Sequence, residues 1–354
     1  MSTGRTVTLL SGHKMPQIGY GTWQAKPGEV GDGVYEALKT GYRHLDLAKI
    51  YQNQREVGEG IKRALADVPG LRREDIFITS KLWNNKHNPE DVAPALDDTL
   101  EELQLEYLDL YLIHWPVAFK PGNELFPKTS DGSELALNRD VSISQTWKGA
   151  FRFPLSCSSP LPVETDILIP TPSAMTELPK SKARSVGVSN FSIEHLEAVI
   201  KATGVVPAVN QVERHPRVPN KPLVDYCASK NIVITAYSAF GNNGWGVPLL
   251  VNTPEVKAVA DRLAKAQGKD VTPAQVILAW SQLGGHVVIP KSVTASRIRE
   301  NFQEVELDDE AIKAIDKLGE QPQRFNIPYT YDPKWNVNVF GDDKEKAAVN
   351  QVVL

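Results

Sequence analysis

The chain has 354 residues, 41% of them hydrophobic and 23% charged, which are ordinary values for a globular protein. Its net charge of −4 offers no electrostatic attraction to nucleic acid or to an anionic membrane. No apolar run approaches the ~20 residues of a membrane span, residues 1–10 have no signal-peptide core, and two cysteines imply no disulfide framework. We therefore expect a cytoplasmic protein, a monomer, with no nucleic-acid or membrane partner.

Short β-branched runs alternate along the chain with amphipathic helical patterns. Thr6–Leu9 and Met15–Ile18 flank Ser11-Gly12, which predicts a hairpin before the first barrel strand. Stretches such as Pro89–Leu103 and Ile193–Ala202 have apolar residues at helical spacing. Eight strand–helix repeats favour an α/β fold in which a parallel sheet closes into a (β/α)8 TIM barrel. The predicted strands are Ile18–Tyr20, His44–Asp46, Ile76–Ser80, Leu108–Ile113, Arg184–Val188, Ala208–Val212, Ile232–Tyr237 and Val287–Pro290.

Residues 149–173 interrupt this order with five prolines and only three charges. Proline is poorly tolerated inside a helix, so a helix that starts at Ser144–Lys148 should stop and resume at Ala174–Leu178. One interpretation is a surface insertion, because loops tolerate extra length at little cost. The other is a retained intron, because the codons of Gly149 and of Ser173-Ala174 could supply splice sites whose use removes 25 codons in frame. Both interpretations stay open at this point.

The chain is otherwise expected to form one barrel domain over residues 1–354. Past a helix at Asp309–Leu318 the pattern becomes irregular and rich in proline, asparagine and aromatic residues. We expect residues 319–354 to be a loop that lies over the active face of the barrel and not a second domain.

Four groups that can move or stabilise a proton lie at three successive strand ends. In a parallel barrel these ends form the floor of the active site. A carboxylate at Asp46 is expected to hold the ammonium of Lys81 by an ion pair, and that ammonium is expected to lower the pKa of the Tyr51 phenol from its ordinary ~10. Tyr51 would then protonate a carbonyl oxygen that His114 orients by a hydrogen bond. Any one of these residues, taken alone, would more often have a structural role. The prediction of a catalytic site rests on four complementary groups at neighbouring strand ends.

Reduction of a carbonyl also needs a hydride, and hence a nicotinamide cofactor. No metal is expected, because the histidines lack ligand spacing and no cysteine pair exists. A Rossmann domain is disfavoured, because no Gly-x-Gly-x-x-Gly motif follows a predicted strand. Asn301 could reach an adenine or lie on an exposed helix. Later strand ends supply side chains that can hold a carboxamide and stack on its ring, then a Lys, a hydroxyl and an Arg that suit a phosphate monoester and favour NADP(H). These residues are Ser189, Asn190, Gln211, Tyr237, Lys291, Ser292 and Arg297.

A set of family-like segments lies at residues 41–51, 78–83, 107–116, 186–191 and 289–292. Together these segments resemble the aldo-keto reductase family, and the similarity runs from about residue 6 to 330 with a break at 149–173. The family resemblance implies a (β/α)8 barrel, NADPH binding across the C-terminal face, and a catalytic tetrad matching Asp46, Tyr51, Lys81 and His114. It assigns the same cofactor contacts as above. Within the family the chain is similar to fungal NADP-dependent glycerol dehydrogenases, although many members have Asn-Glu where this chain has Asn53-Gln54.

Tryptophans next to the proposed site indicate a substrate pocket. Trp23, Trp83 and Trp115 are expected to contact substrate beside His114, with Trp335 supplied by the C-terminal loop, although each could instead pack in a core. The substrate itself is left open among glyceraldehyde, dihydroxyacetone, other sugars and aromatic aldehydes.

The prediction is therefore an NADP-dependent oxidoreductase that reversibly reduces small aldehydes and ketones. One alternative is a barrel that binds NADPH as a regulatory subunit without turnover, which would not need the tetrad. Another is a barrel enzyme that isomerises or hydrolyses sugar phosphates, for which the metal ligands and a catalytic carboxylate pair are missing.

Overall fold

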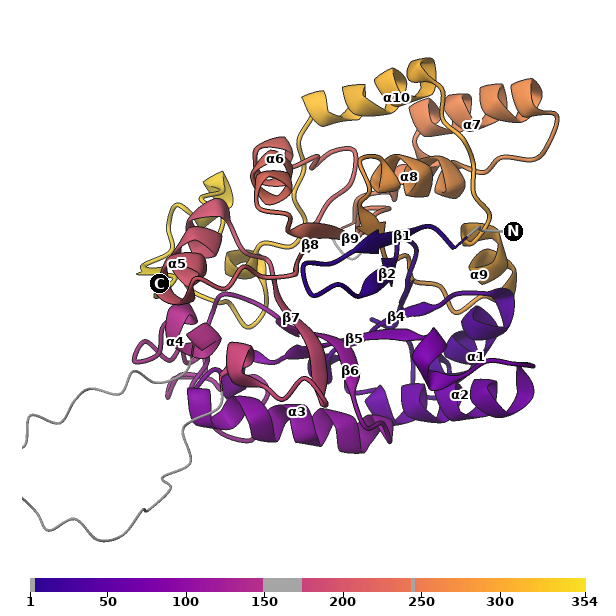
Figure 1. Ribbon diagram of the computed structural model, residues 1–354. Helices are drawn as coiled ribbons and strands as arrows, with labels where there is room; N and C mark the ends of the chain where they lie inside the picture. The colour runs from indigo at the N-terminus through magenta and orange to yellow at the C-terminus, as the bar shows by residue number, and fades with distance from the viewer. Residues whose placement is uncertain (1–3, 149–173, 243–245) are drawn as a thin grey trace, which may run out of the picture.

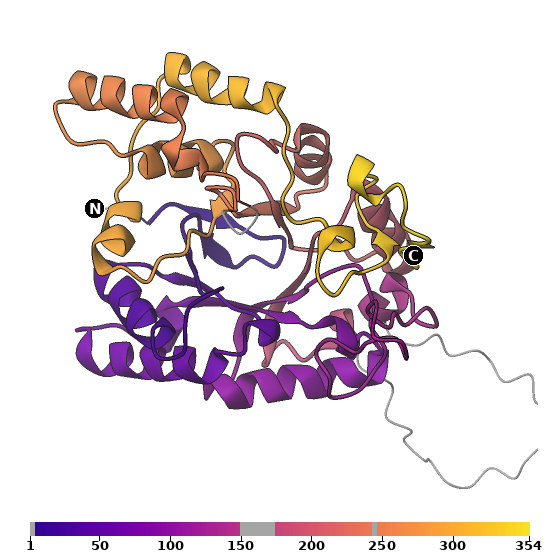
Figure 2. The same ribbon diagram turned by 180° about the vertical axis from the view of Figure 1, so that it is seen from behind.

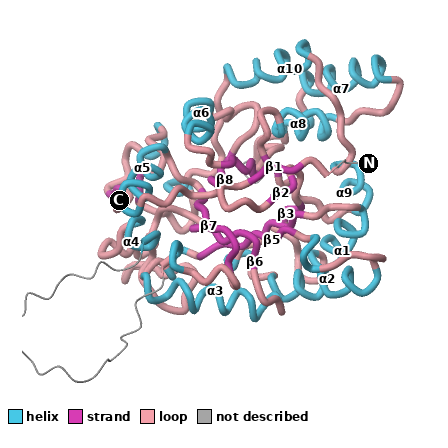
Figure 3. Tube along the Cα trace, in the orientation of Figure 1, coloured by secondary structure: helices cyan, strands magenta, loops and turns pink. Residues whose placement is uncertain are grey.

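The computed structural model describes residues 4–148, 174–242 and 246–354. The predicted insertion or intron at residues 149–173 lies outside the described residues. In the part described, a ring of strands is surrounded by helices (Figures 1 and 3). None of the described helices combines the length and apolar character that crossing a membrane would require.

Eight parallel strands form one curled sheet in chain order, which confirms the predicted (β/α)8 fold. Backbone hydrogen bonds join its two edges, because Val288 N donates to Gln17 O at 2.8 Å and Gly19 N donates to Val288 O at 2.9 Å. The strands are β3 (Tyr20–Gly21), β4 (His44–Asp46), β5 (Phe77–Leu82), β6 (Leu108–Ile113), β7 (Ala183–Ser189), β8 (Val209–Glu213), β9 (Val233–Tyr237) and β10 (Val287–Val288).

The predicted hairpin is present as β1 (Thr6–Thr8) and β2 (Lys14–Pro16), paired antiparallel with Thr6 opposite Pro16. Leu9 and Met15 of this hairpin pack against apolar side chains inside the barrel, among them Phe77 and Leu110. The hairpin therefore closes the end of the barrel at which the strands begin.

Helices cover the outside of the sheet, and local sequence explains where several of them begin. Ser192 and Thr272 each form a capping box with the residue three positions later, and proline occupies the first turn of α3, α7 and α8. The helices are α1 (Val30–Thr40), α2 (Gln54–Asp67), α3 (Pro89–Leu103), α4 (Ile143–Lys148), α5 (Ile193–Thr203), α6 (Lys221–Ser229), α7 (Pro254–Gln267), α8 (Pro273–Gln282), α9 (Ala295–Asn301) and α10 (Asp309–Asp316).

The chain resumes after the undescribed segment differently from the prediction. Instead of a helix over Ala174–Leu178 there is a short 3₁₀ turn at Met175–Glu177. Pro179 explains this, because the residue before a proline is disfavoured in the α-helical region. This turn packs against α4. The described residues on either side of the undescribed segment therefore lie close together.

The inside of the barrel changes from apolar to polar along its axis. Strand side chains alternate between the two faces of the sheet, so every second residue points inward. On β5 the alternating set runs from Phe77 through Thr79 to Lys81, and on β8 it runs from Val209 through Gln211. Both strands are fully buried. The polar end is the one at which the strands finish.

The C-terminal segment of residues 319–354 covers the polar end, as predicted. It contains two short parallel strands, β11 (Val337–Asn338) and β12 (Asn350–Gln351), that the sequence pattern did not indicate. In Figures 1 and 2 the end of this segment lies beside α4 and α5. Trp335 packs edge-on against Trp83 and Trp115.

Candidate active site

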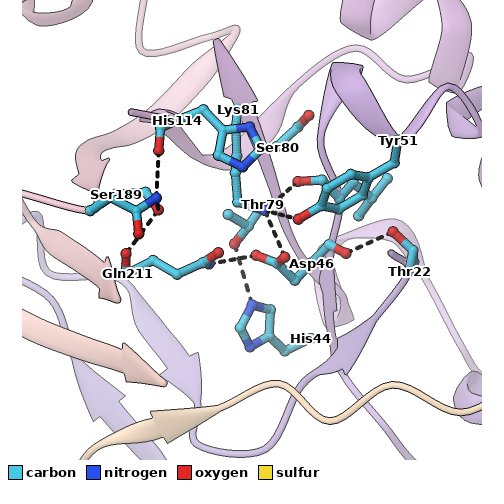
Figure 4. Close-up of polar contacts among 12 residues, drawn as sticks. Thr22, His44, Asp46, Tyr51, Thr79, Ser80, Lys81, His114, Ser189 and Gln211 are labelled. Carbon is cyan, nitrogen blue, oxygen red and sulfur yellow. Dashed lines mark hydrogen bonds and ion pairs between the residues drawn. The ribbon is translucent and has the colours of Figure 1, made fainter. Parts of the chain in front are cut away.

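A buried ion pair forms the centre of the polar end. Asp46 is the last residue of β4, and Lys81 lies near the end of the neighbouring strand β5. The Lys81 Nζ donates to Asp46 Oδ1 at 2.7 Å (Figure 4). It also donates to the Leu47 carbonyl at 2.7 Å. Burial lowers the pKa of Lys81, and the charge and hydrogen bond of Asp46 oppose that change. The pair therefore keeps an ammonium inside the barrel where an isolated one would be costly.

Tyr51 reaches the same ammonium from a short turn. A 3₁₀ turn at Lys49–Tyr51 follows β4, and the backbone then turns sharply because Gln52 adopts a left-handed conformation with φ of 56°. The Lys81 Nζ lies 3.4 Å from the Tyr51 hydroxyl. Burial, followed by the charge of Asp46, raises the pKa of Tyr51 well above its ordinary value. The predicted lowering of this pKa was wrong, because it considered Lys81 without burial.

His114 completes the predicted tetrad from the end of β6. Its ring lies edge-on to Tyr51, with ring centroids 6.0 Å apart, and edge-on to Trp83 at 5.2 Å. Burial, then the charge of Lys81 and the nearby His87, lowers the pKa of His114 well below its ordinary value. The imidazole is therefore neutral at physiological pH and retains one ring N–H as a donor.

The predicted carboxamide-binding residues are joined to the tetrad by hydrogen bonds. Gln211 Nε2 donates to Asp46 Oδ2 at 2.7 Å (Figure 4). Asn190 Nδ2 donates to the His114 carbonyl at 2.9 Å. Ser189 Oγ donates to the Gln211 carbonyl, and the Tyr237 hydroxyl donates to Asn190 Oδ1 at 2.6 Å. This set of amides, hydroxyls and a phenol beside the ion pair fits the chemistry of a nicotinamide carboxamide and ring.

The predicted phosphate-binding residues lie farther along, on the connection from β10 into α9 and on α9 itself. Lys291 Nζ donates to the Gln24 carbonyl at 2.9 Å, and burial lowers the pKa of Lys291. The backbone of Ser292 accepts from Tyr20, while the Arg297 side chain is exposed and Asn301 is buried. Within the described ranges, no hydrogen bond joins these residues to the tetrad. They are therefore grouped only because they are close together in the sequence.

Aromatic side chains form one wall above the tetrad. Trp83 and Trp115 are buried, whereas Trp23 is 42% exposed and lies 6.5 Å from the Tyr51 ring, centroid to centroid. The sequence analysis included these residues and Trp335, but missed other members of the cluster. Their only signal was the aromatic content of residues 119–126 and 329–340. The missed aromatic members are Phe119, Phe126, Tyr331 and Phe340.

No group of three or more His, Cys, Asp or Glu side chains in the described part of the chain could hold a metal ion. The polar end brings together a proton-donating phenol, an ammonium paired with a carboxylate, a neutral imidazole and an amide cluster. This arrangement can protonate an oxygen and stabilise the phenolate that remains.

Comparison with known proteins agrees with this chemistry. Residues 17–320 match the model of the aldo/keto reductase family. The chain is 72% identical over its full length to "D/L-glyceraldehyde reductase" of Hypocrea jecorina, covering 99% of that protein. It is 40% identical to "Aldo-keto reductase family 1 member A1-A" of Danio rerio, over 91% of this chain and 92% of that one.

A solved aldose reductase from Schistosoma japonicum has the same fold, with a TM-score of 0.75 and 37% identity. The match covers 92% of this chain and 94% of that one. The family match, the relatives and the fold together show that this chain belongs to the aldo/keto reductase family, whose members are oxidoreductases that act on small carbonyl compounds with nicotinamide cofactors.

Proposed function

We propose that this chain reduces small polar aldehydes such as glyceraldehyde with NADPH. The observation that carries the proposal is the contact of Lys81 with both Asp46 and Tyr51, beside the neutral ring of His114. The 72% identical relative named as a glyceraldehyde reductase supports the substrate class. A regulatory barrel without turnover would not need a buried ammonium beside a tyrosine.

The side chains of the tetrad divide the work of adding a proton to the carbonyl oxygen. The ring N–H of His114 donates a hydrogen bond to this oxygen and fixes its direction. When bound, the reduced nicotinamide supplies the hydride, which forms the new C–H bond and delivers two electrons. Tyr51 gives its hydroxyl proton to the oxygen, the product is an alcohol, and the phenolate left behind faces the ammonium of Lys81.

An aldehyde panel tests the proposal. NADPH oxidation by the full chain is followed with glyceraldehyde, dihydroxyacetone and an aromatic aldehyde. We expect turnover, with the highest kcat/KM for glyceraldehyde. NADPH binding without oxidation for any member of the panel would instead support the regulatory alternative.

Arg297→Ala tests the choice of NADPH over NADH. Arg297 is exposed on α9 and free to meet a phosphate monoester, and a hydrogen bond to a charged group is worth ~1.5–3 kcal/mol. We expect the Kd for NADPH to rise about tenfold or more, with little change for NADH. Arg299→Ala is the matched control, because Arg299 lies on the same helix and pairs with Glu36. Equal weakening of both cofactors by Arg297→Ala would contradict the assignment.

A further inference from the structure

A second set of contacts holds the turn that carries Tyr51 from the side facing away from the barrel interior. Ser80 Oγ donates to Gln54 Oε1 at 2.7 Å, and Gln54 Nε2 donates to Glu102 Oε2 at 2.9 Å. The other carboxylate oxygen, Glu102 Oε1, accepts from Lys49 Nζ at 2.8 Å. We call these four residues the outer clamp. It connects β5, α2 and α3 with the 3₁₀ turn.

The side-chain amide of Gln54 can satisfy both of its partners in the outer clamp in only one orientation. A carboxylate accepts hydrogen bonds and cannot donate them, so the amide nitrogen of Gln54 must face Glu102. The amide oxygen of Gln54 is then left for the hydroxyl of Ser80. Gln54 is 2% exposed and Ser80 is fully buried, so water cannot easily replace either contact. Lys49 is the one charged side chain that hydrogen-bonds to this amide–carboxylate pair among the described residues.

The outer clamp and the catalytic ion pair share one stretch of backbone. Ser80 and Lys81 are neighbours on β5, and strand alternation sends their side chains to opposite faces of the sheet. Lys81 holds the turn from inside through Leu47 and Tyr51. Gln54, three residues after Tyr51, and Lys49, two residues before it, hold the same turn from outside. The position of the phenol is therefore fixed from both faces.

We propose that Gln54 and Glu102 are positioning residues that set the reach of the Tyr51 hydroxyl toward Lys81 and the substrate. The clamp needs one carboxylate and one amide, because two carboxylates would repel each other and would lack a donor between them. This role presupposes the reductase activity proposed above, and wild-type turnover is therefore measured first. Absence of wild-type turnover rejects the proposed function, whereas the variants below test the clamp only in an active enzyme.

A swap of the two side chains provides the test. Gln54→Glu should lower the single-turnover rate of NADPH oxidation about tenfold, because small displacements of a reacting group have large effects on rate. The loss should diminish as the pH falls from about 8 to about 5.5, because a proton between the two carboxyl groups makes one of them a donor. The double variant Gln54→Glu with Glu102→Gln restores one carboxylate and one amide, and should recover the rate to within about twofold of wild type, since the hydrogen bonds are remade. The Kd for NADPH should stay constant throughout.

Two further variants separate positioning from folding. Ser80→Ala removes only the end of the clamp and should lower the rate about threefold and also lower Tm, since the buried Gln54 Oε1 loses its donor. Asp97→Asn is the matched control, because Asp97 lies on α3 and forms an exposed ion pair with Lys182 at 2.6 Å. It should leave both the rate and its pH profile unchanged. A wild-type rate in Gln54→Glu, or a double variant no faster than that single one, would overturn the proposal.

Discussion

The phenol of Tyr51 is subject to two opposing influences. The Lys81 ammonium at 3.4 Å favours the phenolate, whereas burial and the Asp46 carboxylate favour the neutral form. The pKa of Tyr51 lies above its ordinary value, so the hydroxyl keeps its proton throughout the physiological range. A proton donor needs this state before the hydride arrives, because an ionised phenol has nothing to give.

Tyr51→Phe should abolish nearly all carbonyl reduction while NADPH still binds, because the donor is lost and the cofactor contacts remain. The measurements are kcat with glyceraldehyde and the Kd for NADPH by fluorescence titration. Retention of more than about a tenth of the wild-type kcat, equivalent to a barrier change below ~1.4 kcal/mol, would exclude Tyr51 as the acid.

The sequence predicted which side chains lie at this site, but not all of their properties. Strand ends and spacing indicated Asp46, Lys81 and His114, because the polar residue that follows a buried strand lies at the mouth of a parallel barrel. The direction of the Tyr51 pKa could not be predicted, because it depends on how much protein surrounds the ring. The contact of Gln54 with a partner 48 residues away had no local signal either.

Among the elements, the C-terminal segment depends on one buried carboxylate. Glu213 at the end of β8 accepts hydrogen bonds from the backbone N–H groups of Phe325 and Asn326, at 2.9 and 2.8 Å. His215 Nε2 and the Asn326 side chain also contact this carboxylate. Burial opposes the charged form, but these hydrogen bonds hold the pKa of Glu213 below its ordinary value. Gln211, which hydrogen-bonds to Asp46, lies on the same strand. Strand β8 therefore positions both the catalytic cluster and the C-terminal segment that carries part of the aromatic wall.

Glu213→Gln should loosen residues 319–354, because an amide nitrogen would face backbone N–H donors and leave them unpaired. We expect a loss of ~1–3 kcal/mol in the free energy of unfolding. We also expect a higher KM for aldehyde and faster hydrogen exchange in this segment. Glu74→Gln is the control, since Glu74 is exposed, pairs with Arg72 and lies outside this segment. A wild-type KM together with wild-type exchange would argue against this anchoring role.

At the scale of the whole molecule, buried histidines make stability depend on pH. Burial lowers the pKa of His44 and His195 to about 4 and that of His87 to about 3. The unfolded chain therefore binds these protons first, starting near ~6.5. Stability is fully present above that pH and is lost as the pH falls toward about 4, by up to ~1.4 kcal/mol per pH unit for each histidine.

Urea unfolding at several values from about pH 7.5 to about pH 5 measures this dependence. His87→Gln should reduce its slope, because one proton-binding site of the unfolded state is removed. His13→Gln on the hairpin, where the side chain is only partly buried, serves as the comparison. Identical slopes for His87→Gln and wild type would contradict the assignment to His87.

The interpretation of residues 149–173 also concerns the whole chain. We predict that deleting them raises soluble yield and Tm without changing substrate preference, because the segment is proline-rich and contains the apolar run Ile167-Leu168-Ile169. If the segment is a retained intron, the major transcript should lack 75 bases and encode 329 residues. A deletion variant less stable than the full chain, or transcripts that uniformly keep the segment, would contradict this prediction.

The overall fold was more predictable than the segments that cover it. All eight barrel strands were expected within a few residues, because buried β-branched runs separated by helical patterns leave few other arrangements. The β11–β12 pair was not expected, because its strands are two residues each and pair only after residues 319–354 have folded across the barrel. Such short strands have no periodicity to detect.

The apolar floor of the barrel has a consequence for the order of events during turnover. Leu9, Met15, Phe77 and Val209 fill the interior on the side where the strands begin, and an apolar interior of this kind stays dry. We therefore expect water that restores the proton of Tyr51 to arrive from the polar end, on the same side as the aldehyde. A bound alcohol would stand between that water and the phenolate, so we expect the product to leave before Tyr51 regains its proton.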